Sequence, residues 1–242
     1  MKSQRIRSAF TRKISQLTGK YMNWQIWRDF VIMSATSISN SIDLTHFEER
    51  NDLYGKTAAQ YTPEELSKFV ELLVDTVSAL RTNPDQDFLG DVYMELGLNN
   101  HWKGQFFTPY SICKMMGAMS MGNGEKLVEQ IHQQGYITVN DPACGAGATL
   151  IAAGNAIERA LYEAKSPLHW QDHVVMVAQD IDYIVGLMCY IQLSILGCAG
   201  IVKIGDSLSD PIHSGDDLTN YWFTPAYISL ISKSLIDEET KH

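Results

Sequence analysis

The sequence predicts an α/β protein in which an α-helical region precedes a Rossmann-like, mostly parallel sheet. In the second half of the chain, short apolar runs alternate with helix-like segments, which is typical of parallel strands joined by helices. The runs cover residues 136–140, 172–179 and 199–204. A Gly-rich turn follows the first run, and an aspartate lies just beyond the end of each run. Because parallel sheets bind ligands at the carboxyl ends of their strands, we expect a binding site at those ends.

Helical periodicity dominates the first hundred residues. Residues 24–31 repeat bulky apolar side chains at three- and four-residue spacing, which places them on one face of a helix. A second helix is expected from Thr62, where a capping residue, a proline and two acids open an apolar stripe that reaches residue 77. A third is expected near 86–97. We therefore divide the chain into a helical region, residues 1–104, and a sheet-containing domain, residues 105–242.

Further helices are expected between and beside the strands of the second half. Their predicted ranges are 109–121, 125–133, 147–164 and 182–196. After the third strand, residues 220–223 are compatible with a fourth strand, and residues 226–236 with a C-terminal helix.

The composition is that of an ordinary globular protein, with 45% hydrophobic and 19% charged residues. The four cysteines form no Cys-x-x-Cys pair, which argues against a zinc site and against a disulfide framework. The scattered histidines lack metal-ligand spacing, so we expect no protein-bound metal. The most apolar run, residues 186–202, is too short and too polar to span a bilayer, and the first residues lack the apolar core of a signal peptide. A cytoplasmic location is expected.

Charge is unevenly distributed along the chain, whose net charge is −9. Residues 1–20 hold six of the 19 basic residues and none of the 28 acidic ones. A basic arm of this kind can follow a phosphate backbone, and the alternative is a solvated N-terminal segment. The acidic remainder is a poor surface for DNA, so a nucleic-acid function is expected to need a partner subunit.

The turn Asp141-Pro-Ala-Cys-Gly-Ala-Gly147 is the most informative stretch. Gly145 and Gly147 allow positive φ and a close approach of the backbone to a ligand. The turn is neither a dinucleotide fingerprint nor a Lys-bearing phosphate loop, and its aspartate would repel a pyrophosphate. A ligand with a cationic amine or sulfonium fits better. The alternative is a tight connection between a strand and a helix.

Four segments in this order carry a family resemblance. They are Gly104-Gln-Phe-Phe-Thr-Pro109, the turn 141–147, Gln179-Asp-Ile-Asp182 and Gly205-Asp-Ser-Leu208. Together they resemble the S-adenosylmethionine-dependent N6-adenine DNA methyltransferases, most closely the modification subunits of type I restriction–modification systems. The resemblance covers about residues 85–211 and implies a class I methyltransferase sheet.

The resemblance implies that S-adenosyl-L-methionine is the cofactor. Residues 106–109 would cover its methionine end, with an aromatic face near the sulfonium. Asp141 would hold its ammonium group, Asp180 would accept from both ribose hydroxyls, and Asp206 would accept from the adenine amine. The implied cofactor-binding residues are Gln105, Phe106, Phe107, Thr108, Pro109, Asp141, Ala143, Cys144, Gly145, Gly147, Asp180, Ile181, Asp206 and Ser207. The alternative for a single strand-end aspartate is a helix N-cap.

The family's catalytic motif is Asn-Pro-Pro followed by an aromatic residue, at the end of the fourth strand. Its amide and first Pro carbonyl accept from the amine of a flipped adenine, and its ring stacks on the base. The nearest match here is Thr224-Pro-Ala-Tyr227, so the implied catalytic residues are Thr224, Pro225 and Tyr227. The Thr hydroxyl reaches less far than the amide oxygen of Asn and is less fixed in position. The rate of methyl transfer is therefore predicted to be lower by roughly 10²–10³ or more. The alternative for 224–227 is a turn ahead of the last helix.

In the family's sheet the first strand lies in the middle. Without the fourth strand beside it, its edge would be exposed, and an exposed edge must be paired or covered. We expect residues 218–224 or a partner chain to cover this edge. The resemblance then supports two functions: a partner-dependent DNA adenine-N6 methyltransferase subunit, or a catalytically inactive cofactor-binding module with a regulatory or decoy role. Methylation of a protein or RNA is a weaker third interpretation. DNA is the expected partner, reached through a specificity subunit or a dimer.

Overall fold

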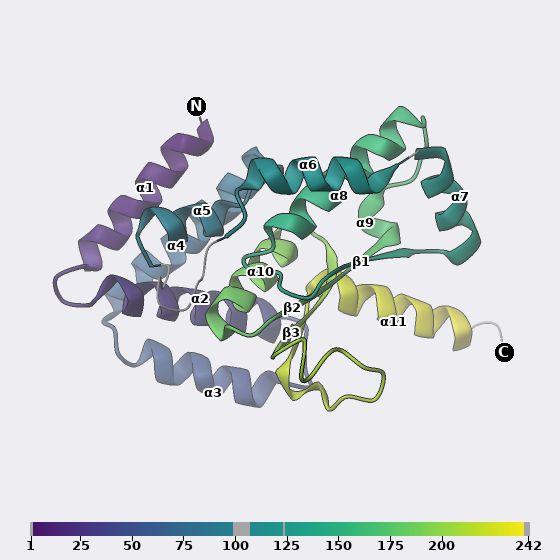
Figure 1. Cartoon of the computed structure of the whole chain (residues 1–242). Coiled ribbons are helices and arrows are strands. Elements are labelled where there is room, and N and C mark those ends of the chain that lie inside the picture. The colour runs from purple at the N-terminus through teal and green to yellow at the C-terminus, as the bar shows by residue number, and fades with distance from the viewer. Residues whose placement is uncertain (1, 99–106, 123, 240–242) are drawn as a thin grey trace.

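The computed structural model describes residues 2–98, 107–122 and 124–239. A group of helices occupies one end of the molecule, and the sheet with its own helices occupies the other (Figure 1). The N-terminal helices are α1 (Lys2–Leu17), α2 (Asn23–Asn40), α3 (Phe47–Ala58), α4 (Pro63–Thr82) and α5 (Phe88–Glu95). The expected helices near 24–31, 62–77 and 86–97 are thus confirmed.

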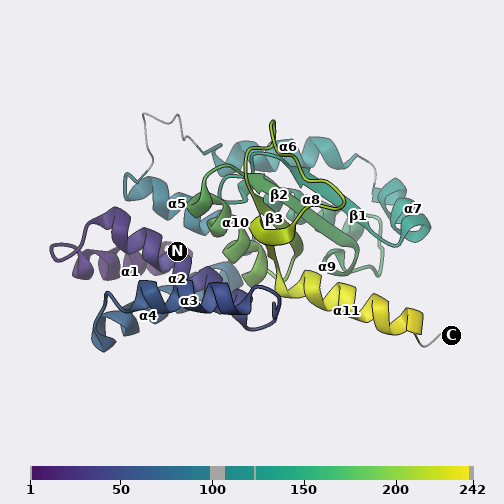
Figure 2. The ribbon, with the colours of Figure 1, turned by 90° about the horizontal axis from the view of Figure 1, so that it is seen from below.

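Helix α4 begins where its capping residues predict. The Thr62 side chain accepts from the Glu65 N–H, and the Glu65 side chain accepts from the Thr62 N–H. This reciprocal pair satisfies N–H groups that the first turn leaves without helical partners. Helix α4 then packs against α1 (Figure 2), with Phe69 and Leu72 buried, whereas Val70 and Val74 of the expected apolar stripe are exposed.

The basic N-terminal segment is part of the helical core. Phe10 and Ile14 of α1 are fully buried. Arg7 pairs with Asp91 at 2.8 Å, and Lys13 pairs with Asp75 at 2.8 Å. The segment is therefore a packed helix, and the expectation of a solvated segment is wrong for its described residues. Arg5 and Arg12 are exposed, so a role along a phosphate backbone stays a prediction. Amphipathic spacing of Phe10, Ile14 and Leu17 is the signal that predicts this outcome.

The sheet has the strand order β1-β2-β3-β4. Its strands are β1 (Ile137–Asp141), β2 (Val174–Asp180), β3 (Ala199–Ile204) and β4 (Tyr221–Phe223). The first three are mutually parallel and β4 is antiparallel to β3. The predicted α/β class with a small, mostly parallel sheet is confirmed, and each predicted strand lies within two residues of the observed one.

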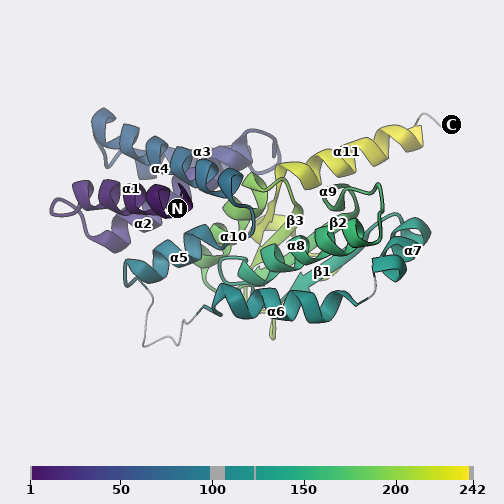
Figure 3. The same ribbon diagram turned by 90° about the horizontal axis from the view of Figure 1, so that it is seen from above.

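One face of the sheet carries the crossover helices α8 (Ala148–Glu163) and α10 (Tyr183–Ile195). Gly154 of α8 lies against Met176, and Gly186 of α10 lies against Ile204. Met176 pairs with Gly200, which is on the same face as Ile204, so both helices share that face. The remaining helices are α6 (Tyr110–Met121), which lies along α8 (Figure 3), α7 (Gly124–Gln134), α9 (Trp170–His173) and α11 (Pro225–Glu239).

The fourth strand closes the edge of β3. Ile201 pairs with Phe223 and Lys203 pairs with Tyr221. We expected residues 218–224 to cover the edge of the first strand. They pair with β3 instead, so this expectation is wrong. Among the described strands, β1 has a neighbour only in β2. The reason is the 205–220 connection, which contains a 3-10 turn at Leu218–Asn220 but no crossover helix and returns the chain beside the strand it has just left.

A buried arginine joins the helical region to this edge. Arg50 of α3 donates to Asp43 Oδ2 at 2.7 Å and to the Tyr221 carbonyl at 2.5 Å. Its guanidinium lies over the Trp222 ring, 3.9 Å from the centroid. Arg50 and Asp43 are 4% and 5% exposed, so this ion pair has almost no contact with water. None of the described helices has both the length and the apolar character required to cross a bilayer.

Replacing Arg50 with Met should lower the free energy of unfolding by about 3 kcal/mol or more, because the Asp43 carboxylate then stays buried without its guanidinium partner. Chemical denaturation followed by circular dichroism measures this loss. Lys56→Met is the control, since its pair with Asp52 is exposed and is worth less than about 1 kcal/mol. Equal stabilities of the two variants would contradict the importance of the buried pair.

Candidate functional site

The carboxyl ends of β1, β2 and β3 meet through backbone hydrogen bonds. The Cys144 N–H donates to the Gln179 carbonyl at 2.9 Å, and the Gly205 N–H donates to the Asp180 carbonyl at 2.9 Å. Asp141, Asp180 and Asp206 therefore lie at one end of the sheet, as the sequence predicts. In a parallel sheet this end is where ligands bind.

The turn after β1 has the backbone that its glycines allow. Gly145 has φ 55° and Gly147 has φ 96°, and Gly147 directly precedes α8. A Cβ on Gly147 would lie 2.9 Å from Cys189 Sγ, while one on Gly145 would lie 3.4 Å from the Phe107 ring. The expected positive φ values are confirmed. They make a side chain costly at both positions, and close packing against Cys189 adds to the cost at Gly147.

Asp180 holds the turn in place from the end of β2. Its Oδ2 accepts from the Gly145 N–H at 2.9 Å, and its Oδ1 accepts from the Asp182 N–H at 2.9 Å. Burial raises the pKa of this carboxyl above its usual value. Each oxygen keeps a second lone pair, so the carboxylate can still accept from two further donors. Asp182, and not Asp180, caps α10 by accepting from Ile184 and Val185, which removes the N-cap alternative for Asp180.

Asp141 and Asp206 flank this group on the neighbouring strands. Asp141 Oδ1 accepts from the Ala143 N–H at 3.1 Å. Asp206 accepts from the Leu208 N–H and the Ser209 hydroxyl, each at 3.0 Å, and these hydrogen bonds hold its pKa below the usual value. No helix follows Asp206, so it fixes a turn and is not a helix cap. Its carboxylate is ionised at neutral pH and partly open to solvent.

The other predicted cofactor residues surround these carboxylates unevenly. Ile181 is 72% exposed beside Asp180, and Ser207 is half-buried after Asp206. Phe107 packs on Tyr93 with ring centroids 5.4 Å apart, while Thr108 and Pro109 are exposed at the start of α6. Cys144 is buried, consistent with a packing residue. Gln105 and Phe106 lie outside the described residues.

Two polar side chains that were not among the predicted site residues hold the loop after β3 in place. Gln179 donates to the carbonyls of Gly205 at 3.3 Å and Asp210 at 2.8 Å. Lys203 donates to Asp210 and Asp216, each at 2.8 Å. Together they fix the loop that carries Asp206. Their signal in the sequence is a long polar residue inside an otherwise apolar strand, which must find partners when it is buried.

The predicted catalytic residues Thr224, Pro225 and Tyr227 lie at the opposite end of the sheet. The Thr224 N–H donates to the Gly200 carbonyl at 3.0 Å, and its hydroxyl donates to the Cys198 carbonyl at 2.7 Å. Gly200 is at the beginning of β3 and Cys198 directly precedes the strand, whereas Asp206 follows its end. Because β4 runs antiparallel to β3, its end lies beside the start of β3. The structure does not bring these three residues to the aspartates.

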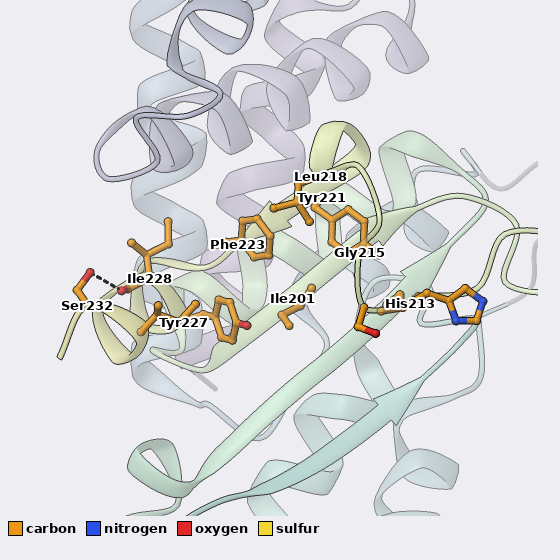
Figure 4. A pocket seen from close by; sticks show the side chains of 12 residues that line it. Ile201, His213, Gly215, Leu218, Tyr221, Phe223, Tyr227, Ile228 and Ser232 are labelled. Atoms are coloured by element: carbon orange, nitrogen blue, oxygen red, sulfur yellow. Dashed lines mark hydrogen bonds between the residues drawn. The ribbon is translucent and has the colours of Figure 1, made fainter. Parts of the chain in front are cut away.

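Tyr227 lines an apolar groove and not the cofactor site at the strand ends (Figure 4). Its ring stacks on Phe223 with centroids 5.6 Å apart, and Phe223 stacks in turn on Tyr221. Ile201, Leu218 and further apolar side chains complete a groove of about 540 Å³. It is larger than the cavity of about 80 Å³ beside the Gly-rich turn, but its lining includes no carboxylate. Among the described residues, no group of His, Cys, Asp and Glu is placed to hold a metal ion.

Comparison with known proteins gives one finding. A family model described as N-6 DNA methylase matches residues 84–240, which is more than half of the chain. The match includes β1 to β4 and the aspartates at the strand ends. No curated protein and no solved structure shows significant similarity to the chain.

Replacing Thr224 with Val should lower the free energy of unfolding by about 1–3 kcal/mol, because the Gly200 N–H and the Cys198 carbonyl lose a buried partner. The same denaturation measurement on Thr219→Val, an exposed threonine on the same connection, should change by less than about 0.5 kcal/mol. A Thr224 variant as stable as the wild type would contradict this structural role.

Proposed function

Since the chain belongs to the N-6 DNA methylase family, we propose that it binds S-adenosyl-L-methionine at the carboxyl ends of β1, β2 and β3. In this proposal it takes part in adenine-N6 methylation of DNA together with a partner subunit, in the manner of a type I modification subunit. The observation that carries the proposal is the pairing of Asp180 with the Gly145 N–H, which joins a paired-oxygen acceptor to a Gly-rich turn.

The chemistry of the residues fits this cofactor. The two oxygens of Asp180 suit the adjacent hydroxyls of a ribose. Asp206 is ionised and suits an adenine amine, with the exposed Ile181 available to contact the ring. The Phe107 ring beside Gly145 offers an aromatic face to a sulfonium. A glycine at 145 leaves open the space in which a ligand and this ring would meet.

The bound cofactor would supply the electrophilic methyl group. The part of this chain would be to orient that group through the ribose and the amino-acid end, so that the methyl points away from the sheet. A target amine also needs hydrogen-bond acceptors that raise its nucleophilicity. Thr224 lies at the other end of the sheet, so in this proposal those acceptors come from a partner.

A second candidate function is a cofactor-binding module without catalysis, with a regulatory or decoy role. The observation that favours it is again Thr224, whose hydroxyl is fully buried and engaged on both sides. Both candidates require cofactor binding, and they differ in methyl transfer.

Replacing Asp180 with Asn should weaken S-adenosylmethionine binding at least tenfold. In the proposal the two oxygens of Asp180 accept from the Gly145 and Asp182 N–H groups and from two ribose hydroxyls, whereas an amide has only one acceptor oxygen. Calorimetric titration measures the affinity. Asp172→Asn, an exposed acid ahead of β2, should bind like the wild type. Wild-type protein that binds no cofactor would overturn the proposal.

Methyl transfer separates the two candidates. Tritiated S-adenosylmethionine and adenine-rich duplex DNA should give labelled DNA only when a type I specificity subunit is added, if the methylation proposal holds. Tyr227→Ala should leave cofactor affinity unchanged, since Tyr227 lies at the opposite end of the sheet. Cofactor binding without transfer, with the specificity subunit present, would favour the inactive module.

A further inference from the structure

A small cavity lies between the Gly-rich turn and the helical region. Its volume is about 80 Å³, and its lining includes Gly145, the start of α8 with Thr149, residues 107 and 108, and Asp87. A water molecule occupies about 30 Å³ of liquid, so the cavity accommodates a group of a few heavy atoms and not a nucleoside. This is the size of the polar end of an amino acid.

Asp87 is the acidic side chain in this cavity. It is 4% exposed and stands immediately ahead of α5. Its Oδ1 accepts from the Gly90 N–H at 2.9 Å and from Gln192 Nε2 at 2.7 Å. No donor among the described residues binds Oδ2. A helix cap needs one acceptor oxygen, which Ser, Thr or Asn would supply without burying a charge. The second oxygen therefore calls for a separate explanation.

The described side chains around Asp87 provide no cation. On its own helix, Asp91 is a like charge that is paired with Arg7. Helix α6 presents Tyr110 and Cys113, whose pKa values are raised, so both are neutral at pH 7. Helix α10 presents the uncharged Gln192.

Two cations of the neighbouring helices α6 and α8 are engaged by Asp85. Lys114 binds Asp85 at 2.5 Å, and Arg159 lies 4.0 Å from the same carboxylate. The Gly-rich turn adds the acid Asp141 and the buried thiol of Cys144. Burial consequently raises the pKa of Asp87 to about 6. This shift stabilises the protein most below the usual Asp pKa of about 4, and the contribution is lost as pH rises through 6. At neutral pH this carboxylate is thus buried with no cation beside it among the described residues.

We infer that Asp87 binds the α-ammonium group at the amino-acid end of the cofactor, so the helical region contributes a cofactor-binding residue. The inference rests on the proposed function and deepens it. A cation placed in the cavity supplies the partner that a buried carboxylate requires. The family resemblance implies that Asp141 holds the ammonium group. Asp141 does not line this cavity, and the inference assigns that role to Asp87.

Gln192 fixes the position of Asp87 relative to the turn. Its Nε2 donates to Asp87 Oδ1 and to the Ala146 carbonyl, at 2.7 and 2.8 Å, and its Oε1 accepts from the Leu89 N–H at 3.1 Å. One fully buried amide thereby connects α5, α10 and the turn. The carboxylate is held against the place where Gly145 and Phe107 meet.

The test compares two ligands that differ in the amino-acid end. S-adenosylhomocysteine carries the ammonium group, and 5′-methylthioadenosine lacks the whole amino-acid portion. Asp87→Asn keeps the acceptor oxygen for Gly90 and Gln192 but places an NH₂ group where Oδ2 lies. At pH 8 we expect this variant to bind S-adenosylhomocysteine at least tenfold more weakly and 5′-methylthioadenosine with unchanged affinity. Asp91→Asn, one turn along the same helix, is the matched control and should bind both like the wild type.

The outcomes separate the inference from the proposed function. Wild-type protein that binds neither ligand overturns the proposed function. If the wild type binds both, unchanged S-adenosylhomocysteine affinity in Asp87→Asn, or an equal loss for both ligands, overturns the role of Asp87. A selective loss in Asp141→Asn alone would return the ammonium to Asp141.

A pH titration of the wild-type protein tests the inference without a variant. Binding of S-adenosylhomocysteine should weaken up to tenfold per pH unit as Asp87 is protonated below about pH 6, relative to 5′-methylthioadenosine. Asp180 contacts the ribose side of both ligands, so its titration cancels in this ratio. A ratio that stays constant between pH 5 and pH 8 would overturn the assignment.

Discussion

Backbone hydrogen bonds between parallel neighbours set the register of β1, β2 and β3, and that register decides which side chains can share a site. With Asp141 opposite Ala178 and Asp180 opposite Ile204, the three strands end together, and the Cys144 and Gly205 N–H groups close the ends onto β2. A slip of one residue would turn every side chain to the other face of the sheet. Asp180 would then lose the Gly145 N–H, and the turn would lose its anchor.

The helical region takes part in this arrangement through buried polar groups. One apolar cluster runs from Phe10 in α1 to Trp222 in β4, so the two parts of the chain share a core. Apolar contacts alone tolerate small shifts, whereas hydrogen bonds of Gln192 and Arg50 demand particular partners. Gln192 fixes α5 on the turn, and Arg50 fixes α3 on β4. Two points of attachment, one near each edge of the sheet, define how the helices sit on it.

Local patterns predicted most of this fold, because apolar periodicity, the Thr62 cap and the glycines of the turn act within a few residues. The same reasoning placed Asp141, Asp180 and Asp206 at one end, since parallel strands share a direction. It failed for Thr224, whose position depends on β4 running antiparallel, a property of the 205–220 connection and not of the motif. It missed Asp87 because the cavity around it forms from segments far apart in the sequence. Whether the implied cofactor residues bind a ligand stays a prediction.

The two ends of the sheet differ in chemistry, and this difference limits how the proposed methylation can work. At the amino end of β3, the Thr224 hydroxyl donates to the Cys198 carbonyl, and the stacked rings of an apolar groove lie nearby. The carboxyl end gathers the acids, and in the proposed function a partner supplies the amide that accepts from the target base. On the β3 side, β4 already occupies the edge, while among the described strands β1 has no neighbour on the side away from β2. An acceptor arriving on a neighbouring strand can reach the carboxyl end only beside β1. In the proposed function, the partner that supplies it must therefore approach Asp141 from that side.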